Sequence, residues 1–341
     1  MGLDWIEAVI AEVAMKLAGP SIRFWPVYIM ATLPICYLIY RFQRVKGSFF
    51  GWLTPKSIYL HKSHMIDLKI FIFGRGLATL GLAQLVFAGA FVAHFISGLF
   101  GEGLGLPPVH PILMTFILLA GADFSTYWVH RIHHESRVFW PFHSVHHSAE
   151  VMTPVTVYRK HPIYDLMGTV LRGVIMGIVQ GVLAGLFLDD VTFVMVMGIN
   201  AGYLVFNMVG ANLRHSHVWL SYGRVIEHIL ISPAQHQIHH SLAPEHHNRN
   251  YGEVLAIWDW MFGTLYIPAK RMDIQFGLGD AHGNRLPQRH DTLTNAMLVP
   301  MRDSWKQIRR MTHRARTKSG SALATDGSPA MSTTNTITPA E

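Results

Sequence analysis

Long uncharged stretches alternate along this chain with segments that carry its charges and most of its histidines. The uncharged stretches cover residues 24–40, 76–101, 106–122, 173–188 and 191–213. A helix needs ~20 apolar residues to cross the hydrocarbon core of a bilayer. The shorter stretches must therefore include flanking residues such as 124–129. The pattern predicts four or five membrane-spanning helices, the last two joined as a tight hairpin at Asp189 and Asp190.

Composition supports an integral membrane protein. Hydrophobic residues make up 50% of the 341 residues and charged residues only 14%, which is unusual for a soluble domain of this length. The fold class that we expect is an all-α membrane helical bundle with a cytosolic histidine-rich cap. The single cysteine, Cys36, excludes an intramolecular disulfide framework. Asp4, Glu7 and Glu12 stand where a cleavable signal peptide would have a positively charged start.

Four regions are expected along the chain. Residues 1–23 form a short lead-in, and residues 24–268 form the main membrane-embedded domain. Residues 269–316 form a polar cytoplasmic extension. Residues 317–341 are rich in Ser, Thr, Ala and Pro and poor in large apolar residues, so we expect a disordered tail.

The distribution of positive charge predicts how the helices are oriented. Five basic residues follow the first apolar stretch within residues 41–62, whereas the linkers 102–110 and 189–191 contain no Lys or Arg. Because cytoplasmic loops of membrane proteins carry excess Lys and Arg, residues 41–68, 131–164 and 215–341 should share the cytoplasm. All the histidine clusters would then lie on one side of the membrane. Arg131 and Arg159 are expected to anchor this side at lipid headgroups.

One histidine pattern occurs twice, as His143-x2-His146-His147 and His236-x2-His239-His240, and a third pair, His130-x3-His134, lies upstream. Imidazole is a common metal ligand, and positions i, i+3 and i+4 share one face of a helix. We therefore expect each triplet to direct three nitrogens at one place. Two copies beside apolar helices favour a metal site over solvated histidines at helix ends.

The number of histidines indicates how many metal ions are involved. At least eight imidazoles are too many for one ion, so the sequence implies two ions with about four imidazoles each. Imidazole suits Zn, Cu, Fe and Ni, so the ligand type does not choose the metal. A metal pair beside apolar helices that could admit a lipid suits activation of O2 for attack on a C–H bond. That chemistry needs a redox metal rather than zinc.

Several motifs resemble the fatty acid hydroxylase/sterol desaturase superfamily of integral membrane proteins. They are Asp123-x4-Trp128-Val-His130-Arg131-Ile-His133-His134-Glu135, Phe142-His143-Ser-Val-His146-His147-Ser148, Arg159-Lys-His161-Pro162, Ser232-Pro-Ala-Gln-His236-Gln-Ile-His239-His240-Ser241, Asn250-Tyr251-Gly252 and Trp258-Asp259-x-Met-Phe262-Gly263-Thr264. The similarity covers residues 110–268. It implies a helical membrane fold with a cytosolic histidine cap over a dimetal centre. Such enzymes use O2 and external electrons to hydroxylate or desaturate lipids.

The resemblance also implies a ligand set. The positions that match the family's metal ligands are His130, His134, His143, His146, His147, His215, His236, His239 and His240. Some members have a further histidine where this chain has Ala211, so His161, His217 or Asn212 is a possible substitute. Glu135 and Asp123 are expected beside the ligands, where a carboxylate can orient an imidazole, although either could be an ordinary polar contact. His133 is expected beside the ligands or at the surface.

We therefore expect a membrane oxidoreductase that oxidises a sterol, fatty acyl or related lipid at two iron ions with O2, with hydroxylation slightly preferred over desaturation. The chain has no dinucleotide-binding fingerprint and no cysteine set for an iron–sulfur cluster. Electrons should come from a ferredoxin or small cytochrome with its reductase, docked on the basic residues Arg214, Arg224, Arg249, Lys270 and Arg271. Two alternatives are a membrane metal transporter with a cytosolic histidine site and a bis-histidine haem carrier. No nucleic-acid-binding motif is present.

Overall fold

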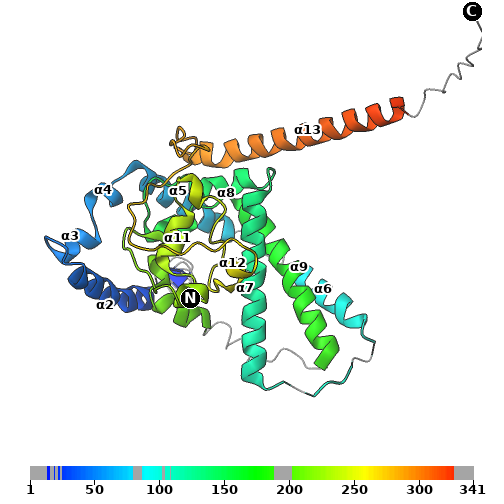
Figure 1. The fold of residues 1–341 in the computed structure, drawn as a ribbon, viewed down its shortest axis with the longest axis horizontal. Coiled ribbons are helices and arrows are strands. Elements are labelled where there is room, and N and C mark those ends of the chain that lie inside the picture. The colour runs from blue at the N-terminus through cyan, green and yellow to red at the C-terminus, as the bar shows by residue number, and fades with distance from the viewer. Residues whose placement is uncertain are drawn as a thin grey trace, which may run out of the picture.

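The computed structural model describes residues 14–15, 19, 22–23, 25–79, 87–101, 104–107, 109–187 and 202–325. Within these ranges the regular structure is helical, and the only β-type pairings are isolated bridges such as Leu230 with Leu255. The all-helical prediction is therefore confirmed for the described part of the chain. Figure 1 shows the helices around a central region built from α7, α8 and α11.

The elements follow one another along the chain in a simple order. They are α2 (Pro26–Phe42), α3 (Phe49–Leu53), α4 (Lys56–Tyr59), α5 (Lys62–Thr79), α6 (Phe87–Gly98), α7 (Pro111–Glu135), α8 (Trp140–His147), η1 (Pro154–Tyr158), α9 (Pro162–Phe187), η2 (Ala211–His215), η3 (Ile226–His228), α11 (Pro233–His239), η4 (Pro244–His246), α12 (Ile257–Met261) and α13 (Leu293–Thr325).

Two of the described helices, α7 and α9, are long and apolar enough to cross a membrane, with 25 and 26 residues. The apolar helices α2 and α6 are shorter. The expected hairpin at residues 189–190 and the first part of the stretch 191–213 lie outside the described residues. Helix α7 takes up the flanking segment 124–129, as expected, and continues without a break to Glu135. His130 and His134 therefore lie on its last turns.

Small residues bring α6 and α9 into close contact. A Cβ atom added at Gly177 would lie 2.5 Å from the carbonyl oxygen of Gly89, and one at Gly181 would lie 2.6 Å from that of Ala93. Glycines four residues apart leave one face of a helix without side chains, so two backbones can pack directly. This packing places α6 along α9 (Figure 1).

Helix α13 packs its first turns on α8 and α5. Ala296 is buried in a core cluster with Ile66, Ile70 and Val145. Beyond this contact the helix extends away from the body and lies crosswise to α7 (Figure 1). It continues to Thr325, past the expected start of the disordered tail at residue 317, in a segment whose Ala, Arg and Lys residues have high helix propensity. Residues 326–341 lie outside the described part.

Candidate metal centre

Short helices with fixed first turns carry both histidine triplets. Helix α8 has Pro141 in its first turn and carries His143, His146 and His147. In α11, Ser232 and Gln235 form a capping box in which the serine hydroxyl accepts from the Gln235 backbone N–H at 3.2 Å. A proline in the first turn and such a cap set where a helix starts. Because the first residue of each helix is fixed, the direction in which each of its histidines points is fixed as well.

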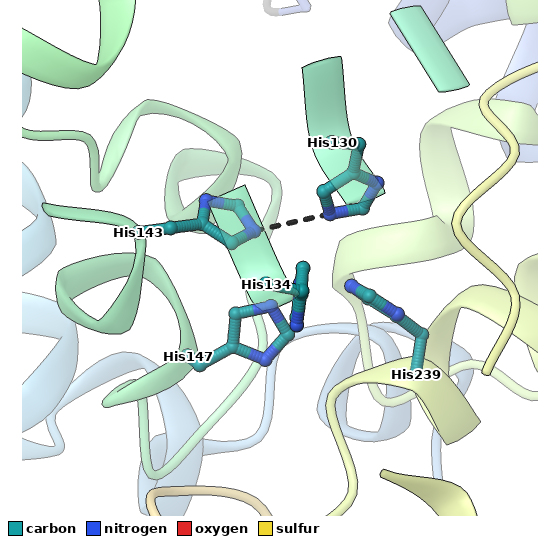
Figure 2. Close-up of side chains that lie close together, drawn as sticks. All are labelled: His130, His134, His143, His147 and His239. Atoms are coloured by element: carbon teal, nitrogen blue, oxygen red, sulfur yellow. Dashed lines mark hydrogen bonds between the residues drawn. The ribbon is translucent and has the colours of Figure 1, made fainter. Parts of the chain in front are cut away.

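The histidines gather into two buried groups of side-chain nitrogens. Within each group one ligand nitrogen per residue lies within 4.8 Å of every other. We call the larger group cluster A and the smaller one cluster B. Cluster A contains His130, His134, His143, His147 and His239 (Figure 2), and cluster B contains His146, His215, His236 and His240.

Each triplet divides between the two clusters, contrary to the expectation that its three nitrogens meet at one place. His143 and His147 of α8 join cluster A, whereas His146 joins cluster B. In α11 the relation is reversed, because His239 joins cluster A while its neighbours His236 and His240 join cluster B. Successive helical residues are 100° apart, so i+4 lies about 40° to one side of i and i+3 about 60° to the other side of i, which lets i+3 face a different centre. Both helices therefore serve both clusters.

Imidazole nitrogens face one another inside the clusters. In cluster A, Nε2 of His130 lies 3.0 Å from Nε2 of His143. In cluster B, Nε2 of His215 lies 3.2 Å from Nε2 of His146 and 3.1 Å from Nε2 of His236. Nε2 of His240 lies 3.2 Å from Nε2 of His236. All four rings of cluster B thus present the same nitrogen to a common centre.

Backbone carbonyls fix two rings of cluster A. Nδ1 of His130 lies 2.8 Å from the carbonyl oxygen of Tyr251, and Nδ1 of His239 lies 2.7 Å from that of Arg249. A carbonyl only accepts, so each Nδ1 carries the proton and Nε2 keeps its lone pair for a metal. The sequence reasoning missed these partners because backbone atoms leave no residue-type signal.

Asn250 and Asp259 hold the segment that supplies these carbonyls. The Asn250 amide donates to the carbonyl oxygens of Gln235 at 3.1 Å and Tyr266 at 3.0 Å. The Asp259 carboxylate accepts from the backbone N–H of Tyr251 at 2.8 Å and of the following glycine at 2.7 Å. Asn250 has a positive φ of 55°, a conformation that asparagine tolerates better than most residues.

Burial keeps the imidazoles in the neutral form that binds metals. It lowers the pKa of His239 to about 4. Burial, and then the neighbouring imidazoles, lower the pKa of His147 and of His240 well below the ordinary histidine value. A protonated ring has no free lone pair, so these pKa values favour ligation at neutral pH.

The donor set fits two metal ions. Nε2 of His134, His147 and His239 is buried and has no hydrogen-bond partner among the described residues. Buried polar atoms are ordinarily satisfied, so unpaired nitrogens that converge on one centre are suited to a cation. A set made only of imidazoles accommodates iron, copper, zinc or nickel.

The two carboxylates predicted beside the ligands have other partners. Asp123 accepts from the backbone N–H groups of Val254 at 3.0 Å and Leu255 at 2.9 Å and from the Trp258 indole at 3.1 Å, rather than from an imidazole. It therefore attaches α7 to the segment before α12. Glu135 forms an ion pair with Arg131 at 2.9 Å one turn earlier on α7, and its side chain is 45% exposed.

The possible substitute ligands lie outside both clusters. Nε2 of His161 bonds to the Met297 carbonyl oxygen at 2.9 Å, and its Nδ1 accepts from the Ile163 backbone. Nε2 of His217 lies 2.8 Å from the Trp52 carbonyl oxygen, and the Asn212 amide donates to the carbonyl of Arg23. His133 is fully buried, and its Nδ1 bonds to the Val129 carbonyl oxygen at 2.7 Å.

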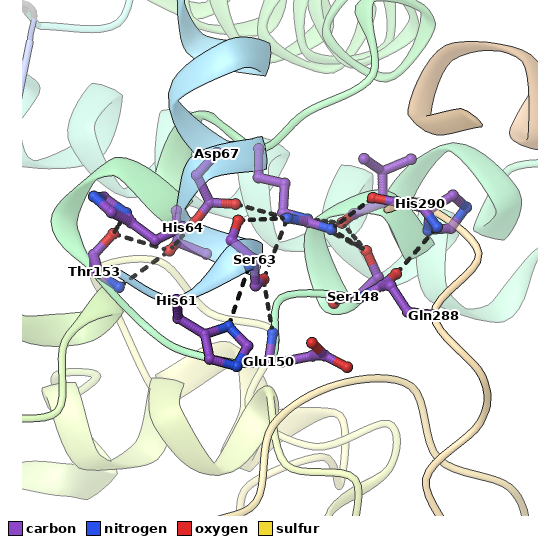
Figure 3. A network of polar contacts seen from close by, with 12 residues as sticks. His61, Ser63, His64, Asp67, Ser148, Glu150, Thr153, Gln288 and His290 are labelled. Carbon is purple, nitrogen blue, oxygen red and sulfur yellow. Dashed lines mark hydrogen bonds and ion pairs between the residues drawn. The ribbon is translucent and has the colours of Figure 1, made fainter. Parts of the chain in front are cut away.

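Two arginines are not at the surface positions expected for them. Arg159 is fully buried and forms an ion pair with Asp67 at 2.8 Å, in a network that also reaches Ser148 and His290 (Figure 3). It therefore cannot anchor at headgroups. Arg214 is buried beside Glu253 and donates to its carbonyl oxygen, so it is withdrawn from any docking face. Among the other predicted docking residues, Arg224, Lys270 and Arg271 are exposed and Arg249 is partly buried.

Residues 115–264, which contain both clusters, match the sequence model of the fatty acid hydroxylase family. The chain contains a fatty acid hydroxylase domain. This confirms the resemblance that the motifs predict. No solved structure is detectably similar to the chain.

Several curated proteins are similar to part of the chain. Alkylglycerol monooxygenase of Xenopus tropicalis is 30% identical over 165 residues, which cover 48% of this chain and 32% of that protein. Ornithine lipid hydroxylase of Rhizobium tropici is 29% identical over 173 residues, covering 50% of this chain and 48% of that protein. A Delta(7)-sterol 5(6)-desaturase of Aspergillus fumigatus is 26% identical over 213 residues, which cover 61% of this chain and 56% of that protein. The chain thus spans from about a third to a little over half of the length of these relatives.

Proposed function

We propose that the protein is a membrane-bound, O2-dependent lipid oxidoreductase, a hydroxylase or desaturase with a di-iron centre. The observation that carries this proposal is the pair of adjoining buried clusters with five and four imidazoles. Iron bound there would supply the redox chemistry needed to oxidise an unactivated C–H bond with O2. The relatives' names refer to alkylglycerol, ornithine lipid and sterol, which supports a lipid as substrate.

The residues of the chain would hold and shield such a centre. The Tyr251 and Arg249 carbonyls orient His130 and His239, and burial keeps the ligands neutral. The clusters lie at the α8 end of α7, beside the apolar surface of a candidate membrane span. A lipid chain can reach that end from the bilayer, while the charged loops remain in water. We place these loops in the cytoplasm.

An external electron donor is part of this proposal. Oxidation of a C–H bond by O2 needs two electrons from outside the substrate, and the sequence has no dinucleotide fingerprint or cysteine cluster. The exposed side chains of Arg224, Lys270 and Arg271 would attract an acidic ferredoxin or small cytochrome with its reductase. Added NAD(P)H alone should leave the enzyme inactive, and donor with reductase should restore turnover.

The transporter alternative is not favoured by the position of the ligands. Transport sites lie near the middle of the membrane, between broken helices. Here His130 and His134 are on the last turns of an unbroken α7, and the other ligands lie on short helices beyond it.

Metal content and turnover of matched variants test the proposal. We expect about two iron ions per chain in the active protein purified in detergent. His147→Ala in cluster A and His236→Ala in cluster B should each lower iron content and abolish oxidation of lipid substrates, measured by mass spectrometry of lipids from cells with and without the gene. His94→Ala, on α6 and outside both clusters, is the control that should retain metal and activity.

Two results would overturn the proposal. One is active protein that contains only tightly bound zinc, because zinc has no redox chemistry. The other is full lipid oxidation by both cluster variants.

A further inference from the structure

Helix α13 exposes a stripe of large apolar side chains. Leu298, Met301, Trp305 and Ile308 are exposed by 59%, 48%, 60% and 36%. Their spacing of three, four and three residues places them on one face of the helix. We call these four residues the apolar stripe. Buried Ala296, which packs on Ile66 and Ile70 of α5 and Val145 of α8, lies on the opposite side of the helix.

Basic side chains border the apolar stripe. Arg302, Lys306, Arg309 and Arg310 are all exposed. At 100° per residue, Arg302 and Arg309 lie next to the stripe, and Arg310 lies on the opposite face. The nearby acidic residue, Asp303, is already shared among Arg289 at 2.5 Å, Lys306 at 3.8 Å and Arg302 at 4.0 Å. The exposed part of the helix therefore carries excess positive charge.

The direction of α13 identifies the kind of surface that would cover the stripe. The helix packs on α8, at the end of α7 where the histidines lie, and runs crosswise to α7 (Figure 1). If α7 crosses the bilayer, α13 runs along the membrane plane at that end. An apolar stripe with a tryptophan and flanking Lys and Arg is typical of a helix that lies in the membrane interface.

We propose that α13 is an interfacial helix that binds the surface of an anionic lipid bilayer through the apolar stripe and its basic border. The apolar side chains enter the boundary between headgroups and acyl chains, and the cations contact lipid phosphates and carboxylates. A second copy of the chain is a poorer occupant, because stripe-to-stripe contact would bring two sets of basic side chains together. This inference concerns membrane attachment outside the metal clusters and does not depend on the reaction.

Site-specific fluorescence on the full-length protein tests the proposal. In a Cys36→Ala background, Ile308→Cys or Met301→Cys is labelled with an environment-sensitive dye, with Arg310→Cys as the matched control on the opposite face. The protein is reconstituted as one copy per nanodisc, in phosphatidylcholine alone or mixed with phosphatidylserine. We expect the stripe labels to shift to shorter wavelength and to be quenched by nitroxide lipids in the anionic discs, while the control label stays accessible to iodide in solution.

Charge variants and the number of protein copies per disc distinguish membrane binding from self-association. Arg302→Gln/Lys306→Gln/Arg309→Gln should weaken lipid quenching at the stripe, and rising salt should weaken it in the unmodified helix. Equal access of iodide to the labels at residues 308 and 310 in anionic discs would refute the proposal. Shielding that appears only when two copies share a disc, whatever the lipid, would assign the stripe to self-association and would also overturn it. Metal content of each labelled protein confirms an intact catalytic domain.

Discussion

Replacing Arg159 should destabilise the protein severely, because this side chain joins three separate segments inside the fold. Its guanidinium pairs with Asp67 of α5, donates to the Val145 carbonyl oxygen of α8 at 2.8 Å, and contacts Ser148 at 2.9 Å. It also donates to the His290 carbonyl oxygen, just before α13, at 3.2 Å. The side chains of Arg159 and Asp67 are both fully buried.

The size of the stability loss follows from the buried groups that the substitution leaves without a partner. Arg159→Met keeps most of the length and apolar volume but leaves the Asp67 carboxylate buried without its counter-ion. Removing one partner of a buried ion pair costs about 3–5 kcal/mol. The freed acceptors on Val145 and His290 add to this cost. A typical domain is stable by only about 5–15 kcal/mol, so the variant should lose a large share of its stability.

A double-mutant cycle distinguishes the interaction energy of this ion pair from a general loss of packing. Unfolding is measured in detergent for Arg159→Met, Asp67→Asn and the double variant. Because Asp67→Asn removes the uncompensated charge, the double variant should lose less stability than the sum of the single losses, by about 2–3 kcal/mol. An Arg159→Met variant within about 0.5 kcal/mol of wild type, or strictly additive losses, would refute the reasoning.

Three further predictions concern separate parts of the fold. Asn250→Asp replaces two donated hydrogen bonds by repulsion between oxygens, so metal affinity measured against a chelator should fall about 10–100-fold. Asn248→Asp is the control: Asn248 also has a positive φ but is exposed, and its substitution should leave metal affinity unchanged. Burial lowers the pKa of His290 to about 4, below its unfolded value of about 6.5, so its stabilising contribution is present above about pH 6.5 and is lost as the pH falls towards 4. His290→Gln should therefore remove about 2 kcal/mol of the destabilisation measured between pH 7 and pH 5, and an unchanged pH profile would contradict this. Gly177→Val should cost about 1–3 kcal/mol in thermal unfolding because its side chain meets the Gly89 backbone, while Gly98→Ala, which has open space, should be tolerated.

The sequence was informative where residue type alone decides the outcome. Runs of apolar residues predicted α7 and α9 as candidate spans. Histidine spacing predicted eight of the nine residues that gather in the two clusters, and the family resemblance added the ninth, His215. Arg159 shows where this reasoning fails. A lone arginine between polar residues looks like a headgroup anchor, and its burial depends on Asp67 and His290, which lie far from it in the sequence. Composition alone cannot identify such long-range partners.

Helix geometry explains why each histidine triplet divides between the two clusters. An H-x-x-H-H pattern directs i and i+4 to one side and i+3 about 60° away from i, so a helix lying between two centres supplies both. Because α8 gives two ligands to cluster A and one to cluster B, and α11 does the reverse, neither cluster is complete without both helices. A small rotation of either helix would therefore displace ligands in both clusters at once. Pro141 at the start of α8, the capping box of α11, the Arg159 network behind α8 and the Asn250 contact to the Gln235 carbonyl of α11 restrict that rotation. We therefore expect these groups outside the clusters to be needed for metal binding as well.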